Sequence, residues 1–225
     1  MAYLTLFSVW LLPLLFAITF HEAAHGFVAR AFGDDTASKL GRVSLNPIKH
    51  IDPFGTVLLP ALLLLSGSPF LFGYAKPVPV RFRALHPQRA GMILIAAAGP
   101  LTNLVLAIIS AASFHLLAYL PRTPALWLAE NLKNAILINV FLAVFNLFPI
   151  PPLDGGRIAV GVLPQFLARP LSRLEPYGLP LLLILLVVLP AVGTRMGYDF
   201  SFVSQVISFF SKTLIGAILH ITGNT

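Results

Sequence analysis

The stretch LTLFSVWLLPLLFAITFHEAAHGFVARAF, residues 4–32, decides the fold of this chain. No charged residue precedes Glu22 in it, so an apolar run long enough to cross the hydrocarbon core of a bilayer leads into the sequence HEAAH. Ionisable side chains at lipid depth are costly and are kept where they have a function. The stretch therefore predicts a membrane-spanning first helix with reactive side chains, His21, Glu22 and His25, near one end.

The spacing of the two histidines indicates a metal site. Positions i and i+4 lie on one face of a helix, one turn apart, so His21 and His25 can present two imidazole nitrogens to the same ion. Glu22 sits beside them with a free carboxylate, and this HExxH pattern is typical of zinc hydrolases in which the glutamate is the general base. Zinc held by two histidines still needs a third protein ligand and an open position for water.

The composition is that of an integral membrane protein. Of 225 residues, 57% are hydrophobic and 10% are charged, with a mean hydropathy of +0.88, whereas about a quarter of a soluble domain is charged. The further apolar stretches are residues 91–120, 134–148, 177–192 and 200–221, the last of which either crosses the membrane or lies in its interface. We therefore expect an all-α polytopic fold with about four to five transmembrane helices.

A small β or re-entrant element is expected between the first and second spans. Residues 36–53 read as a hairpin or strand pair at the membrane surface, and the apolar run 54–65 is too short to span comfortably. Residues 70–83 carry prolines that restrict the segment to an edge strand or polyproline form. Such an edge could receive an extended peptide, and an ordinary surface loop is an equally good interpretation.

The charge pattern predicts an orientation. The net charge is +7, but no basic tract interleaved with aromatic residues occurs, so we expect no nucleic-acid partner. If the first helix enters from outside and residues 54–65 do not cross, most Lys and Arg fall on the side of the HEAAH end, which the positive-inside rule makes cytoplasmic. We expect a multi-pass protein of the cell (inner) membrane, with its active site toward the cytoplasm.

The third ligand can be sought by elimination. The chain has no cysteine, so a metal must be held by His, Asp or Glu. Of its 8 acidic residues, only Glu22 and Asp154 lie among apolar spans rather than in predicted loops or at span ends. Asp154 follows the irregular run 149–153, and irregular backbone at membrane depth is tolerated where it is buried or lines a wet cavity. Asn103 is a further amide at lipid depth, which either makes an interhelical hydrogen bond or lines the site.

HEAAH and the later motif NLFPIPPLDG, residues 146–155, together resemble the site-2 protease family of intramembrane zinc metalloproteases. GPLTN, residues 99–103, is similar to the glycine-proline-asparagine stretch of that family, and residues 73–80 are similar to its proline-containing loop near the substrate path. The resemblance implies one Zn²⁺ per chain and the following site: zinc ligands His21, His25 and Asp154, catalytic base Glu22, Asn146 on the substrate or its oxyanion, and Asn103, Gly73 and Pro77 toward the substrate.

The expected form is compact, without PDZ or CBS domains. It is a single integral membrane metalloprotease domain over residues 1–225, with a core over 1–160 and C-terminal helices over 161–225. The expected reaction is hydrolysis of peptide bonds in membrane-spanning or membrane-anchored proteins by zinc-activated water, with Glu22 as general base. Two alternatives stay open: a membrane transporter that uses the same three ligands, for which Glu22 is dispensable, and a non-catalytic binder of transmembrane helices.

Overall fold

All regular secondary structure is helical in the part of the chain that the computed structural model describes, residues 2–58, 62, 65 and 75–224. Within those residues, five helical segments are long and apolar enough to cross a membrane. They are Ser8–Ala31, Gln88–Tyr119, Arg122–Asn146, Gln165–Met196 and Phe202–Ile221. The prediction of an all-α protein with about four to five such helices is confirmed, and 200–221 belongs to them by length and composition.

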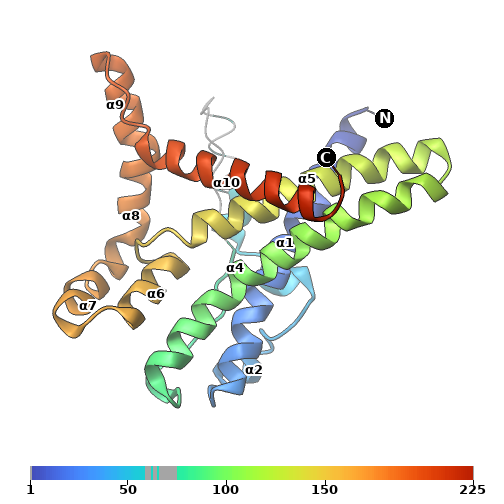
Figure 1. Ribbon diagram of the computed structural model, residues 1–225. Helices are drawn as coiled ribbons and strands as arrows, with labels where there is room; N and C mark the ends of the chain where they lie inside the picture. The colour runs from blue at the N-terminus through green and yellow to red at the C-terminus, as the bar shows by residue number, and fades with distance from the viewer. Residues whose placement is uncertain (1, 59–61, 63–64, 66–74, 225) are drawn as a thin grey trace.

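Three helices form the core that carries the site: α1 (Ala2–Ala31), α4 (Gln88–Ala112) and α5 (Arg122–Asn146). They pack against one another more extensively than any other set of elements, and Figure 1 shows them crossing at the centre of the molecule. Small side chains line their contacts: Ala17, Ala107 and Ala143 have no exposed surface. In a bilayer, where apolar burial between helices gains little, such small residues let helices approach closely enough for dispersion and hydrogen bonding to hold them.

A bent connection follows α5 and leads into the short helix α6 (Asp154–Val162). Two glycines at its start allow the close packing: a Cβ on Gly155 would lie 2.1 Å from the carbonyl oxygen of Leu147, and one on Gly156 would lie 2.3 Å from the backbone nitrogen of Pro151. Only hydrogen fits at either position. The first turn of α6 is therefore folded back onto the connection, which fixes where Asp154 lies.

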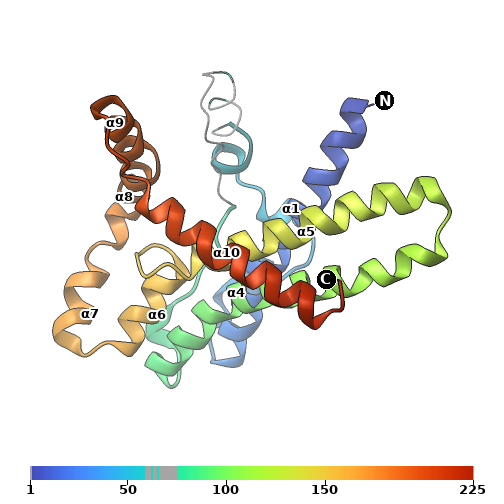
Figure 2. The ribbon, with the colours of Figure 1, turned by 45° about the horizontal axis from the view of Figure 1, so that its top comes forward.

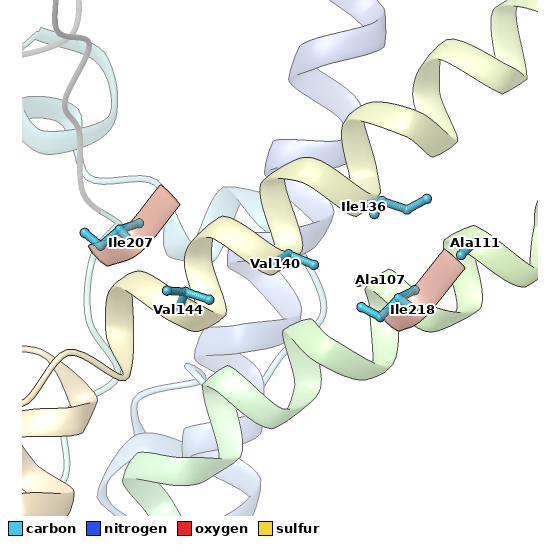
Figure 3. Close-up of a cluster of buried hydrophobic side chains, with 7 residues drawn as sticks. All are labelled: Ala107, Ala111, Ile136, Val140, Val144, Ile207 and Ile218. Atoms are coloured by element: carbon cyan, nitrogen blue, oxygen red, sulfur yellow. The ribbon is translucent and has the colours of Figure 1, made fainter. Parts of the chain in front are cut away.

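Of the C-terminal helices, α10 (Phe202–Ile221) packs on the three-helix core. Helices α7 (Gln165–Ser172), α8 (Gly178–Leu183) and α9 (Leu189–Met196) extend away from the core in Figure 2, while α10 lies across α4 and α5. Figure 3 shows the cluster at this crossing. It consists of Ala107, Ala111, Ile136, Val140, Val144, Ile207 and Ile218.

The connection between α1 and α4 differs from the prediction. Its described residues contain no strand, so the prediction of a hairpin or strand pair over 36–53 is wrong. The connection instead contains α2 (Thr36–Lys39), a 3₁₀ turn η1 (Pro47–His50) and a π-helical turn η2 (Pro53–Leu58). Local side chains explain the difference. Asn46 accepts a hydrogen bond from the Ile48 N–H at 3.1 Å, and Asp52 accepts from the N–H groups of Phe54 and Gly55 at 3.0 and 2.7 Å. Such side-chain bonds to the backbone favour turns over strands.

The re-entrant prediction over 54–65 lies partly outside the described residues, as does the part of 70–83 that contains Gly73. From residue 75 to 81 the chain has no regular structure, and hydrogen bonds from its backbone N–H groups hold it in place. The N–H of Lys76 donates to the carbonyl of His50 at 2.9 Å, and the N–H of Arg81 donates to Asp34 Oδ2 at 2.5 Å. The segment is therefore anchored on both sides of its middle, where it passes the site.

The second of these anchors has a testable pH dependence. Asp34, 2% exposed, accepts hydrogen bonds from the N–H groups of Thr36 (3.0 Å) and Arg81. Burial by itself raises the pKa of this carboxyl, but the hydrogen bonds from Thr36 and Arg81 and the charge of Arg81 hold that pKa below its ordinary value. A carboxyl whose pKa is lower in the folded state stabilises that state above the unfolded-state pKa, and the stabilisation is lost as pH falls through the folded-state pKa.

We expect Asp34→Ala to lower the free energy of unfolding by about 1.5–3 kcal/mol at neutral pH, the usual value for hydrogen bonds to a charged group. The difference from wild type should shrink as pH falls below about 4. The measurement is thermal unfolding of both proteins in the same detergent, from neutral pH to below about pH 4. Comparing the two proteins at each pH removes the effect of other acidic groups. A difference that does not change with pH would show that the Asp34 charge has no part in the anchor.

Candidate metal centre

Two histidines of α1 and the first residue of α6 meet inside the core. The Nε2 atoms of His21 and His25 are 3.1 Å apart, and Asp154 Oδ2 lies 3.2 Å from the first and 3.4 Å from the second. All three side chains are buried, with 7%, 8% and 5% of each residue exposed. Residues separated by more than 120 positions in the sequence thus present three potential ligand atoms to one point, and the described residues contain no second group of this kind.

The hydrogen bonds behind the histidines determine which ring nitrogen faces the site. His25 Nδ1 lies 2.7 Å from the backbone carbonyl oxygen of Ile95 in α4, and a carbonyl only accepts, so this nitrogen carries the hydrogen. His21 Nδ1 lies 2.5 Å from Asn103 Oδ1 in the same helix. With the hydrogen on Nδ1, a neutral imidazole presents the Nε2 lone pair to the site, which is the arrangement of a metal-ligating histidine with an outer hydrogen bond.

This donor set fits zinc. Three electron-rich atoms face one another, and Asp154 Oδ2 is buried without receiving a hydrogen bond. In a tetrahedral zinc site with bonds of about 2.0–2.2 Å to nitrogen and oxygen, ligand atoms lie about 3.3–3.5 Å from one another. The observed separations of 3.1, 3.2 and 3.4 Å are close to these edges. Two imidazoles and a carboxylate leave one corner of a tetrahedron for water or substrate.

One glycine of α4 leaves the space that the histidine rings occupy. A Cβ on Gly99 would lie 2.5 Å from His21 Cε1 and 2.6 Å from the Nε2 atoms of His21 and His25. Any side chain at position 99 would therefore displace the rings. The backbone of α4 forms one side of the centre at this position, and the same helix provides the hydrogen-bond acceptors at Ile95 and Asn103.

Glu22 lies next to the ligand group without belonging to it. The side chain is half-buried, and its Oε2 accepts a hydrogen bond from the N–H of Val78 at 2.9 Å. Val78 is the middle of the segment 75–81 and is itself 7% exposed. A carboxylate held in this way is a general-base candidate at the edge of the centre, and the segment 75–81 runs beside it.

The other predicted site residues fall into three groups. Asn103 has no exposed surface, and its Oδ1 lies 2.5 Å from His21 Nδ1, so its side chain makes an interhelical hydrogen bond behind that ring. Asn146 is the last residue of α5, and its amide donates to the carbonyl of Leu142 in its own helix at 3.0 Å. Pro77 is exposed next to Val78, and Gly73 lies outside the described residues.

Some groups at the centre were not predicted. Asn139 of α5, 3% exposed, accepts a hydrogen bond from Asn103, and it could have been selected by the same rule as Asn103, since it is an amide in an apolar helix. The backbone groups of Ile95 and Val78 could not have been selected, because every residue type other than proline carries both a donor and an acceptor.

Comparisons with known proteins agree with this geometry. The model of peptidase family M50 matches residues 9–125 and 122–189. YwhC of Bacillus subtilis, named as a zinc metalloprotease, is 40% identical over 191 residues, 82% of this chain and 82% of its own length. Rip2 of Mycolicibacterium smegmatis, which carries the same description, is 27% identical over 91% of this chain and 78% of its own length. MJ0611 of Methanocaldococcus jannaschii, also so described, is 31% identical over 62% of this chain and 62% of its own length.

No solved structure matches the chain significantly. The family model nevertheless covers most of its length, and the relative from B. subtilis is similar over four fifths of both sequences. The relatives are named as zinc metalloproteases, which agrees with the His, His and Asp group in the core. The chain belongs to peptidase family M50, the site-2 protease family, and is a membrane zinc metalloprotease.

Proposed function

We propose that this protein hydrolyses peptide bonds of membrane-spanning or membrane-anchored proteins at the centre between α1, α4 and α6. The observation that carries the proposal is the meeting of His21, His25 and Asp154, buried among helices of transmembrane length, with Glu22 beside them. His21, His25 and Asp154 hold one zinc ion. When bound, zinc supplies Lewis-acid polarisation of a carbonyl and activation of water.

Glu22 is the general base in this proposal. Its Oε2 is oriented by the Val78 N–H, and its other carboxylate oxygen has no hydrogen bond among those found in the described residues. That oxygen takes a proton from the attacking water and later returns it to the leaving amine, the two transfers that a single carboxylate performs in peptide hydrolysis.

The substrate approaches along the segment 75–81. This segment has no regular structure and passes the Glu22 carboxylate, and its exposed Pro77 has no N–H to donate. A transmembrane helix conceals its peptide bonds in its own hydrogen bonds, so a substrate must unwind locally at the cleavage point. Asn146 contacts the substrate or its oxyanion in this proposal, after exchanging its present bond to the Leu142 carbonyl.

The surroundings are part of the same proposal. The exposed apolar residues of α8, α9 and α10 face acyl chains of a cell membrane, and the asymmetry of Lys and Arg orients the centre toward the cytoplasm. Residues 1–225 act as one metalloprotease domain. The transporter alternative has less support, because the described residues contain one ligand group and no second one that could continue a path.

Zinc removal tests the proposal directly. We expect the full chain, reconstituted in liposomes with a membrane-anchored reporter protein, to lose cleavage after treatment with a chelator and to regain it when about one equivalent of zinc per chain is restored. The measurement is the amount of reporter fragment against time, together with the zinc content of the protein. Cleavage by fully demetallated protein would contradict the proposal, and zinc movement across the vesicles without cleavage would favour the transporter.

A further inference from the structure

A chain of buried amides leads from α5 to the metal centre. Asn103 and Asn139, which are 0% and 3% exposed, lie between α4 and α5 in the three-helix core. Asn103 Nδ2 donates to Asn139 Oδ1 at 2.8 Å and to the Ala17 carbonyl of α1 at 3.2 Å. Asn103 Oδ1 lies 2.5 Å from His21 Nδ1. One side chain thus joins all three core helices and touches a ligand.

The partners of Asn103 determine which way its amide points. Both N–H groups of its side chain are directed at oxygens, a carbonyl of α1 and an amide oxygen of α5. A rotation of the amide by half a turn would place its oxygen against those two oxygens and would remove both of these hydrogen bonds. Because buried polar groups without partners are costly, the rotated form is disfavoured at both contacts. The oxygen therefore faces His21.

Asn139 is oriented in the same manner. Its Nδ2 donates to the Ala135 carbonyl of its own helix at 2.9 Å, which directs its Oδ1 toward Asn103. The direction of donation then runs without a break from His21 to Asn103, from Asn103 to Asn139, and from Asn139 to the Ala135 carbonyl. The last member is a backbone oxygen, which can only accept.

We propose that Asn139 is a positioning residue for the metal centre. It acts through Asn103 and keeps the hydrogen of His21 on Nδ1, so that the Nε2 lone pair faces Asp154 and the metal. Among the described residues Asn139 has no hydrogen bond to the ligand group itself, and its effect is transmitted by two hydrogen bonds, from Asn139 to Asn103 and from Asn103 to His21. The inference rests on the metal-binding part of the proposed function and not on the identity of the substrate.

The chain offers a matched control in Asn134. It lies on the same helix, is also 3% exposed, and its Nδ2 donates to the Val9 carbonyl of α1 at 2.9 Å, toward the other end of that helix. Asn134→Leu and Asn139→Leu therefore remove the same chemical group from the same kind of interhelical position. Only Asn139 is connected to His21.

The test is the zinc affinity of the full chain in detergent, measured by competition with a chromogenic chelator, together with the visible absorption of the cobalt(II) form. We expect Asn139→Leu to raise the zinc Kd about 10-fold, the lower end of the range for losing an outer hydrogen bond of a ligating histidine, because Asn103 keeps its second bond to the Ala17 carbonyl. The tetrahedral cobalt bands should weaken. Asn134→Leu should change the Kd less than about threefold, whatever it does to thermal stability.

A conservative variant separates positioning from packing. Asn139→Asp keeps an oxygen toward Asn103 Nδ2, so we expect it to retain most of the zinc affinity that Asn139→Leu loses. If leucine is not accommodated, Asn139→Ala, which only removes atoms, takes its place in the comparison. Wild-type zinc affinity in the leucine or alanine variant, or an equal loss in the Asn134 control, overturns the inference. Absence of zinc binding by the wild-type protein would instead overturn the proposed function.

Discussion

Glu22→Gln is expected to abolish peptide-bond cleavage while leaving zinc bound. The amide has almost the size of the carboxylate, and its oxygen can still accept the hydrogen bond that Oε2 receives from the Val78 N–H at 2.9 Å. What it lacks is a basic site that can take a proton from water. General-base catalysis contributes about 10²–10⁴-fold to an enzymatic rate, so the cleavage rate should fall by about 10³-fold.

The rate is measured with a membrane-anchored reporter in liposomes, and the zinc content is determined on the same preparations. Glu130→Gln is the control: Glu130 is an exposed carboxylate in the first half of α5, paired with Lys133 at 3.7 Å. We expect that variant to cleave at the wild-type rate. Undiminished cleavage by Glu22→Gln would rule out Glu22 as the base, and loss of zinc in it would show that the residue acts on the metal.

Gly99→Ala should have the second large effect, this time on metal binding. A methyl group at position 99 would lie 2.5–2.6 Å from ring atoms of His21 and His25, closer than non-bonded atoms can approach. Both rings must move, and a displaced ligand loses more than a lost outer hydrogen bond, so the zinc affinity should fall on the order of 100-fold or more. Cleavage falls with it, because fewer chains carry the ion.

The matched substitution is Gly216→Ala in α10, where an added Cβ has no neighbour within 4 Å. Alanine is a better helix former than glycine, so this control should be neutral or slightly stabilising. The measurement is chelator competition on both variants, with thermal unfolding to confirm that each is folded. Normal zinc affinity in a folded Gly99→Ala protein would show that the histidine rings do not lie where this account places them.

The spans were predictable because their signal is physical and simple. A run of apolar residues in a chain that is only 10% charged has few alternatives to a membrane helix, and the span 91–120 corresponds closely to the helical segment Gln88–Tyr119. The start of α5 was placed late, at 134 rather than Arg122, because Glu130 and Lys133 read as loop residues. In the structure they form an exposed pair in the first half of the helix, at 3.7 Å.

The ligand group was predictable for a different reason. Ionisable residues are so rare at lipid depth that His21, His25 and Asp154 could be grouped before any contact between them was known, and the structure brings them within 4.8 Å of one another. The sequence also indicated Asn103, as either an interhelical hydrogen-bond partner or a residue that lines the site. Its hydrogen bonds to His21 and Asn139 could not be predicted from the sequence.

The connection 36–53 was not predictable from residue preferences. Its β-favourable residues suggested strands, and a strand pair needs continuous pairing of backbone groups. Here the caps made by Asn46 and Asp52 satisfy the backbone locally, so short helical turns form instead. The contact between the Val78 N–H and Glu22 was equally inaccessible, because it joins a backbone group to a side chain far away in the sequence.

The measurement that tests the central claim most directly is X-ray absorption at the zinc edge, combined with zinc stoichiometry, on the purified full chain and on Asp154→Asn. The account predicts one zinc per wild-type chain, with two imidazole nitrogens and oxygen ligands at about 2.0–2.2 Å. It also predicts a large loss of bound zinc in Asp154→Asn, because a neutral amide is a much weaker ligand than a carboxylate. Equal zinc content and an unchanged absorption spectrum in the variant would contradict it.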